Sequence, residues 1–438
     1  MSLTISIVAT ISVTLFLYHV CWPLFFSPLA RIPGPKSFAF TKLKLAYEDY
    51  RGTRTRAIHR LHEEYGSVVR VGPNEISFNS LMALRKIYGA GSSFGRPESF
   101  YRIFDVYGQP HMFTFYSSSE HSTRKKMMSR MYAKSTILNR TVANSIQSKV
   151  KQFLDLIESD IQTASHLAKS LHYYSLDNIT WMVFGGSGGA TAALTGRSSD
   201  QEVLSDIHQP TARKHSWFQI HFPRYTGWAM SCGSGLKSIL DLVGLLPGEK
   251  PVAYSGLQDY ALATFKAHKG DTSTEPDSEG GLMRRLLNEQ ANSDSISDMG
   301  IAAECADHLD AGLKTTSDTL MFTLWALSLP GNQQYPQRLA DEVDSVRDSS
   351  SNDGSVSSAD LCDRLPFLDA VIKESLRLYA PIPSSQPRVS HSDETIDGYL
   401  IPAGTIVSCQ SYSLHRNPEV FHDPYKFNPD RWLAGEAE

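Results

Sequence analysis

The order of apolar and polar positions along this chain predicts a mostly helical protein with an apolar start. From Leu3 to Phe26 the residues are mainly apolar, and no Asp, Glu, Lys or Arg occurs before Arg31. About 20 such residues suffice to cross the hydrocarbon core of a bilayer. From about Ser295 to Leu329 apolar residues recur at helical spacing without proline, which predicts one long core helix.

Weaker patterns predict the remaining elements. We expect a helix over Arg54–Tyr65, two short strands around Gly72-Pro73-Asn74, and a helix over Ala359–Tyr379 that ends before a run of prolines. Asp397-Gly398 is typical of a hairpin turn. Polar stretches at 185–190, 270–281 and 350–358 are interpreted as surface loops. The predicted fold class is mainly α, with small β-sheets at opposite ends of the sequence.

Composition excludes some classes of protein. The 438 residues suggest about three domains by length alone, although one large domain is compatible. The net charge of −4 gives no sign of general nucleic-acid affinity. The five cysteines are scattered without metal-binding or CxxC spacing, so we expect a reducing compartment and no metal held by such a motif. They are Cys21, Cys232, Cys305, Cys362 and Cys409.

The N-terminal segment is predicted to be a membrane anchor. Tyr18 and Trp22 lie near one end, where interface aromatics occur, and the basic residues from Arg31 onward place the following chain in the cytosol. A cleaved signal peptide is the alternative, but it would have a positive start and a shorter apolar core. The expected organisation is an anchor at 1–30, a stiff proline-rich linker with the start of the catalytic domain at 31–53, and the main domain at 54–438.

The middle of the long predicted helix contains residues that are poor helix formers. Ala311 and Thr315 are four positions apart and share a face, with Gly312 between them. Glycine lets another group approach the backbone, and a threonine hydroxyl can bond to the carbonyl one turn back and open the helix. Taken alone, this is more simply a weak point in a core helix; facing a cofactor, it makes a polar niche.

A second pattern involves charges at helical spacing. Glu374 and Arg377 are three positions apart and lie side by side on one face of the predicted helix. Most such pairs are solvated, but apolar neighbours favour partial burial here, and a buried pair needs further partners. Arg431, placed by the turn at Asn428-Pro429, is a candidate partner for Glu374.

The order and spacing of these motifs resemble those of the cytochrome P450 family. The sequence has AGxxTT, then ExxR about sixty residues later, then PDRW about fifty residues further on. The resemblance also includes Pro33-Gly34-Pro35 after the anchor and the segment from Ile401 to Trp432, and it covers nearly the whole chain. It implies a cytochrome P450 fold that binds haem b.

The resemblance implies roles for individual residues. The oxygen-binding groove and its proton supply would involve Ala311, Gly312, Lys314, Thr315 and Thr316. The haem propionates would be held by charge-assisted hydrogen bonds from His121, Arg124, Lys125 and Arg388. The fold behind the haem would be locked by Glu374, Arg377 and Arg431.

The sequence departs from the family pattern in two ways. The family's glycine-rich loop with the iron-ligating cysteine follows PDRW, and no cysteine here has that context. We therefore expect a truncated member that lacks this loop and its following helix, through a gene-model or splicing error, and that does not catalyse as it stands. Lys314 occupies a position that usually holds an acid; either proton delivery runs through Asp310 or water, or Lys314 points away.

The expected function is that of a haem-thiolate monooxygenase that inserts one atom of O₂ into a lipophilic organic substrate. The resemblance implies electrons from NADPH-cytochrome P450 reductase and a single-pass location in the endoplasmic reticulum membrane, with the domain in the cytosol. Segments such as "SLHRNPEVF" are most similar to fungal members of secondary metabolism. The alternative is a membrane-tethered remnant that binds no haem.

Overall fold

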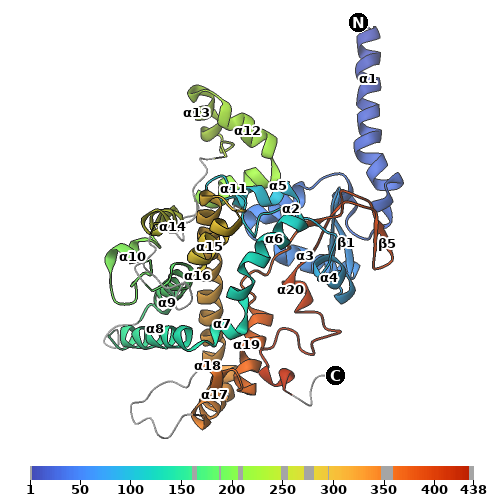
Figure 1. Ribbon diagram of the computed structural model, residues 1–438. Coiled ribbons are helices and arrows are strands. Elements are labelled where there is room, and N and C mark those ends of the chain that lie inside the picture. Colours follow the sequence, from blue (N-terminus) through green and yellow to red (C-terminus); the bar gives the residue numbers. More distant parts are fainter. Residues whose placement is uncertain are drawn as a thin grey trace.

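The computed structural model describes residues 2–159, 165–186, 189–205, 211–247, 255–270, 281–293, 295–346 and 359–433. The predicted loops at 271–280 and 350–358 and the centre of the glycine cluster, 187–188, lie outside the described residues. The chain begins with α1 (Ser2–Phe16) and continues in the π-helix η1 (Leu17–Phe26). Together they project from the rest of the molecule (Figure 1). The span Thr4–Phe26 is long and apolar enough to cross a membrane, and none of its most apolar window is buried.

The segment after the anchor is packed against the domain rather than forming a free spacer. It folds into two short 3₁₀ helices, η2 (Pro28–Arg31) and η3 (Lys36–Ala39), whose Phe38 is buried. The Arg70 guanidinium is 4% exposed and donates to carbonyls on both sides, including that of Pro23 at 2.8 Å. The end of the anchor and the domain are therefore connected by direct hydrogen bonds.

The long predicted helix is present as α16 (Asp298–Ser328) and runs through the middle of the molecule (Figure 1). Its N-terminus is capped by Ser297, whose side chain accepts from the Gly300 N–H. Against it pack α9 (Leu167–Phe184), α14 (Ser255–His268) and α15 (Leu282–Ser293), and α8 (Arg140–Ser159) packs on α9. The largest apolar core lies between these helices and includes Leu176, Leu257, Leu286, Ile301 and Leu309.

The two predicted sheet regions join into one sheet. The strands β1 (Val68–Gly72) and β2 (Glu75–Phe78) pair antiparallel around the predicted turn, and β2 then pairs in parallel with β6 (Ile406–Cys409). The strand β3 (Arg388–Val389) completes the order β1-β2-β6-β3. A separate hairpin joins β4 (Glu394–Ile396) to β5 (Tyr399–Ile401) through Asp397 and Gly398, both at positive φ.

The remaining helices cover the sheet and the cavity described below. The predicted helix at 359–379 is split into α18 (Ala359–Cys362) and α19 (Pro366–Leu378), because Pro366 cannot continue a helix and instead starts a new one. The predicted helix at 54–65 is confirmed as α3 (Arg54–Tyr65). The other α-helices are α2 (Leu43–Arg51), α4 (Leu81–Tyr88), α5 (Glu98–Tyr101), α6 (Ser118–Met128), α7 (Lys134–Ile137), α10 (Ser198–Glu202), α11 (Thr211–His221), α12 (Pro223–Ser231), α13 (Ser234–Leu242), α17 (Gln334–Ser345) and α20 (Ser411–Leu414). The other 3₁₀ helices are η4 (Arg102–Phe104), η5 (Ser129–Tyr132), η6 (Pro330–Asn332) and η7 (Pro429–Trp432).

Candidate active site

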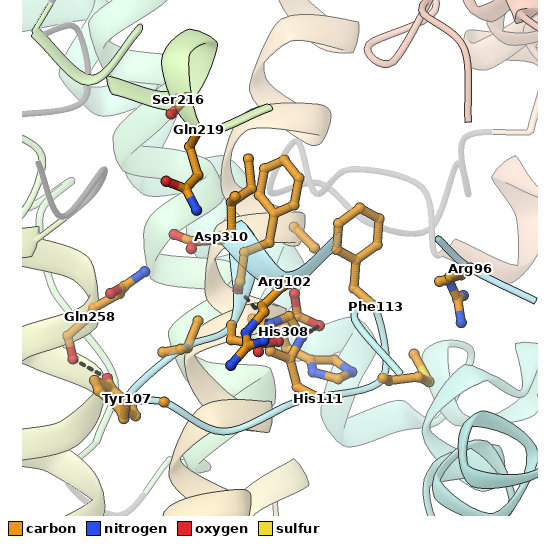
Figure 2. Close-up of a pocket in the computed structure, with 18 of the residues that line it drawn as sticks. Arg96, Arg102, Tyr107, His111, Phe113, Ser216, Gln219, Gln258, His308 and Asp310 are labelled. Carbon is orange, nitrogen blue, oxygen red and sulfur yellow. Dashed lines mark hydrogen bonds and ion pairs between the residues drawn. The ribbon is translucent and has the colours of Figure 1, made fainter. Parts of the chain in front are cut away.

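A large cavity lies against the middle of α16. Its volume is about 1450 Å³, and its walls come from α16, α11, α12, α14 and the segment between α5 and α6. Figure 2 shows Gln258 and Tyr107 on one side of this cavity and Arg96 on the other. Ala311, Gly312 and Thr315 all line it. The poor helix formers of the sequence therefore face a space that can hold a ligand.

The threonine at this wall bonds to the helix backbone, as its residue type suggested. The Thr315 hydroxyl donates to the Ala311 carbonyl at 2.6 Å, and Thr319 and Thr323 repeat this bond one and two turns later. The helix is not opened by it, because α16 is continuous from Asp298 to Ser328. The niche is a polar stripe on an intact helix rather than a local break.

Gly312 has a packing reason in addition to its place at the cavity. A Cβ at this position would lie 2.5 Å from Cδ1 and 2.6 Å from Cγ1 of Ile179 on α9. Such distances are far below van der Waals contact, so the glycine allows α9 and α16 to pack closely. The group that approaches the Gly312 backbone is therefore a side chain of a neighbouring helix.

Two other predicted groove residues lie outside the cavity lining. Neither Lys314 nor Thr316 belongs to the residues that line it, whereas Asp310 does. This placement agrees with the simpler expectation, in which the lysine points away from the site.

A group of basic side chains borders the cavity near α6. His121 and Arg96 line it, and Arg388 lies beside them on β3, with its guanidinium donating to the Tyr101 hydroxyl at 2.6 Å. Burial and then the charges of Arg96, Lys125 and Arg388 lower the pKa of His121 to about 4. In the described part of the chain neither Arg96 nor Arg388 has a carboxylate within ion-pair distance, and the buried Nε of Arg96 has no hydrogen-bond partner. The cluster is thus an uncompensated positive site.

Arg96 was missed at the sequence level, and Arg124 has a different partner from the one expected. Arg96 follows a β-bridge at Gly95, and no helical spacing linked it to His121. Arg124 points to α16, where its guanidinium donates to Glu304 at 2.6 Å. Arg124 also lies over the Phe115 ring and is not part of the cavity lining.

The predicted lock behind the site is a dense network around one carboxylate. Glu374 is fully buried and accepts two hydrogen bonds from Arg377, both at 2.8 Å. It also accepts from Arg431, from the Asn428 N–H and from the Trp432 indole N–H, at 3.2, 2.8 and 2.9 Å. Burial alone would raise the pKa of Glu374, but these donors outweigh it and lower the pKa.

A second polar cluster on α16 was not singled out in the sequence. Glu304, Asp307 and His308 are spaced i, i+3 and i+4, and bring their carboxylate and imidazole atoms within 4.8 Å of one another. They precede Ala311 by one to two turns on the same side of α16. This spacing was a readable signal, although their partners His111 and Tyr132 come from other segments.

The comparisons with known proteins agree with this fold. The family model for cytochrome P450 matches residues 249–438. The cytochrome P450 monooxygenase stcB of Emericella nidulans is 28% identical over 94% of this chain and 74% of its own length. The cytochrome P450 monooxygenase aflV of Aspergillus parasiticus is 28% identical over 94% and 77%, respectively. A zebra fish cytochrome P450 structure with progesterone superposes with a TM-score of 0.67 at 20% identity, covering 87% of this chain and 85% of that chain.

A mostly helical domain with small sheets and a large internal cavity is the fold of this class of haem enzymes. The family model and the fungal relatives together support a cytochrome P450 family member, by family a monooxygenase with haem b as its cofactor, and the solved structure shows the same fold.

The residues present fit the edge of a haem. Propionates are anionic and require cations, and the buried, unpaired Nε of Arg96 beside His121 and Arg388 supplies that need. The axial thiolate has no counterpart among the cysteines of this sequence. None of the five lines the cavity, and burial raises the pKa of Cys409 to about 12 and also raises that of Cys305. A buried thiol of this kind resists the deprotonation that ligation requires.

Proposed function

We propose that this chain binds haem b in the cavity beside α16 and forms the haem- and substrate-binding part of a monooxygenase that acts on a lipophilic organic substrate. One oxygen atom of O₂ enters the substrate and the other leaves as water, with two electrons from NADPH. The observation that carries the proposal is the shared cavity: the Ala311–Thr315 wall, the His121 imidazole and the Arg96 guanidinium border the same space of about 1450 Å³.

The protein residues have binding and proton-holding roles in this proposal. Haem with a thiolate ligand supplies the O₂ chemistry, because the thiolate favours O–O cleavage. Arg96, His121, Lys125 and Arg388 would hold the propionates through charge-assisted hydrogen bonds. The Thr315 hydroxyl, bonded to the Ala311 carbonyl at 2.6 Å, holds a proton at the cavity wall. If the Thr315 hydroxyl turned from the Ala311 carbonyl to an acceptor in the cavity, its proton would point into the cavity.

The lining favours a large lipophilic substrate. Most of the surface that lines it is apolar, with contributions from Phe104, Phe113, Ile179 and Met230. Such a lining stabilises a ligand mainly by removing apolar surface from water. The relatives stcB and aflV come from fungi, and by analogy we place the substrate in fungal secondary metabolism.

The partner and the location follow from the charges and the anchor. Lys125, Lys126 and Arg130 are exposed and form a basic face on α6 and η5, which suits an acidic NADPH-cytochrome P450 reductase. We place residues 1–30 across the endoplasmic reticulum membrane, with 31–53 at its surface and the domain 54–438 in the cytosol. The absence of lysine and arginine before Arg31 and the positive residues after it support this orientation.

Hemin titration of the purified chain in detergent tests the proposal. We expect saturable binding, weakened about tenfold by Arg96→Gln or Arg388→Gln, because a hydrogen bond to a charged group contributes roughly 1.5–3 kcal/mol. Arg85→Gln is the matched control, since Arg85 is exposed on α4 and away from the cavity. Absence of saturable uptake would favour the alternative, a membrane-tethered remnant without haem. The Soret band of the reduced CO complex then reports whether the axial ligand is a thiolate.

A further inference from the structure

One wall of the cavity is a segment with little regular structure. Residues 101–115, between α5 and α6, contribute ten of the lining side chains, including Phe104, His111 and Phe113. Apart from η4, the segment has only an isolated bridge between Val106 and Gln109, and turns. Segments with few backbone ladders open locally at low free-energy cost. The contacts that hold this wall closed therefore decide how often the cavity opens.

Two of these contacts end on carboxylates of α16. The Met112 N–H donates to Oε1 of Glu304 at 2.9 Å, and Nδ1 of His111 lies 3.1 Å from Oδ2 of Asp307. Figure 2 shows His111 and His308 close together where the wall meets the helix. A third contact, from the Tyr107 hydroxyl to the Gln258 carbonyl, reaches α14 and involves no group that titrates near neutrality.

Glu304 is held in an environment that resists its ionisation. Its side chain is fully buried, and Oε2 has no hydrogen-bond partner in the described structure. Arg124 on α6 donates to Oε1 at 2.6 Å, which offsets part of the burial cost. Burial first, and then the charge of Asp307, raise the pKa of Glu304 to about 7 despite Arg124 and His111.

The pKa of His111, the histidine on this wall, is also raised. His111 is 1% exposed, and burial would lower its pKa, but the interactions with Asp307 outweigh burial and raise it. The other titratable groups facing this cluster are His308, whose pKa is lowered by burial, and Tyr132 and Cys305, whose pKa values are raised by burial. At neutral pH these three stay uncharged, so Glu304 and His111 are the groups that change charge.

We propose that residues 101–115 form a proton-linked gate to the cavity, which closes with proton uptake at Glu304 and His111 and opens as the pH rises. Opening would expose both side chains to water and return them to their ordinary affinities for protons. Both groups bind protons more tightly in the closed state than in the open state. Closure is therefore favoured on the acid side, and its stabilisation is lost as the pH rises through their closed-state pKa values. Glu304 acts here as a positioning residue, because it holds the wall and does not touch the ligand.

The size of the effect follows from the two proton affinities of Glu304. With a closed-state pKa of about 7 and an ordinary value of 4.5, the opening constant rises about tenfold between pH 6 and pH 8 by linkage. His111 adds a further increase in the same direction. Glu304→Gln keeps an acceptor for the Met112 N–H and has no charge, so it should remove the Glu304 part of the dependence.

Hydrogen–deuterium exchange of the full chain in detergent tests this gate without haem or substrate. Peptides covering 101–115 are compared at pH 6, 7 and 8, corrected for intrinsic exchange, with β1–β2 peptides as the internal reference. We expect about a tenfold relative rise in exchange for the native chain, and a flatter profile with less exchange at pH 8 for Glu304→Gln. The control Glu419→Gln, an exposed carboxylate far along the sequence, should behave as the native chain.

A second readout guards against a variant that simply fails to fold. The rate of Nile red entry into the native chain should rise with pH in parallel with the exchange. A pH-independent profile for 101–115 in the native chain, or an unchanged slope in a folded Glu304→Gln variant, overturns the proposal. Because no step requires haem, either failure is distinguishable from failure of the proposed monooxygenase function.

Discussion

Replacing Glu374 by glutamine should lower the free energy of unfolding far more than the loss of a carboxylate charge on the surface would. The carboxylate is fully buried and accepts from Arg377, which is 2% exposed, and from Arg431. Removing it leaves two guanidiniums without a counter-charge, one of them completely enclosed. Breaking a buried pair in this way costs about 3–5 kcal/mol. The Arg102–Glu98 pair on the surface, with both side chains more than half exposed, is the matched contrast, and Glu98→Gln should cost roughly 0–1 kcal/mol.

Urea unfolding of the three proteins, followed by tryptophan fluorescence, measures the difference. Trp432 reports locally, because its indole N–H donates to Glu374. The pKa of Glu374 is lowered in the fold, so its stabilisation is present above the ordinary carboxyl pKa and is lost as the pH falls through the folded value. The native protein should therefore approach the Glu374→Gln variant in stability only in acid. If the free energy of unfolding of the variant lies within about 1 kcal/mol of the native value at pH 7, the network around Glu374 does not stabilise the fold as proposed.

Three further results are expected. Gly312→Ala should destabilise the native chain, because overpacking against Ile179 costs about 1–3 kcal/mol and exceeds the gain of about 1 kcal/mol in helix propensity; in an Ile179→Ala background the same change should stabilise, and equal signs in both backgrounds would refute the packing argument. Arg96→Gln should raise the pKa of His121 above its value of about 4, measured by imidazole NMR; an unmoved pKa would mean that the charge of Arg96 does not act on His121. In a version of the enzyme that also carries the family's cysteine loop, Lys314→Asp should leave product formed per NADPH consumed unchanged, since Lys314 does not line the cavity; a clear gain or loss in yield would show that it takes part in proton delivery.

Local signals in the sequence were sufficient to predict the elements that are formed by residues close together in the sequence. The helix at 54–65, the turn at Gly72–Asn74 and the long central helix follow from periodicity and turn residues, and the structure has them where expected. The spacing of Glu374 and Arg377 likewise showed the pair. The parallel pairing of β2 with β6 was missed, since periodicity tells which face of a strand is buried but not which strand lies beside it.

The same limit applies to the candidate site. The polar stripe at Ala311–Thr315 was visible because it contradicts helix propensity. The partner of Arg124 was not, because Glu304 lies 180 residues away and nothing in either segment indicates the other. Periodicity predicted one helix at 359–379, but Pro366 starts a new helix, so the local effect of the proline outweighed the periodicity.

The parallel pairing of β2 and β6 has a consequence for how the chain is made. Phe78 on β2 pairs with Cys409 on β6. One edge of β2 therefore has no neighbouring strand until more than three hundred further residues have left the ribosome. At about 5–20 residues per second, that wait is on the order of tens of seconds. During it, an apolar strand edge stays open close to the membrane, where it can pair with the wrong chain. Chaperone protection of the nascent N-terminal third should therefore matter more for the yield of this protein than protection of its helical middle, whose contacts are mainly between helices that leave the ribosome closer together.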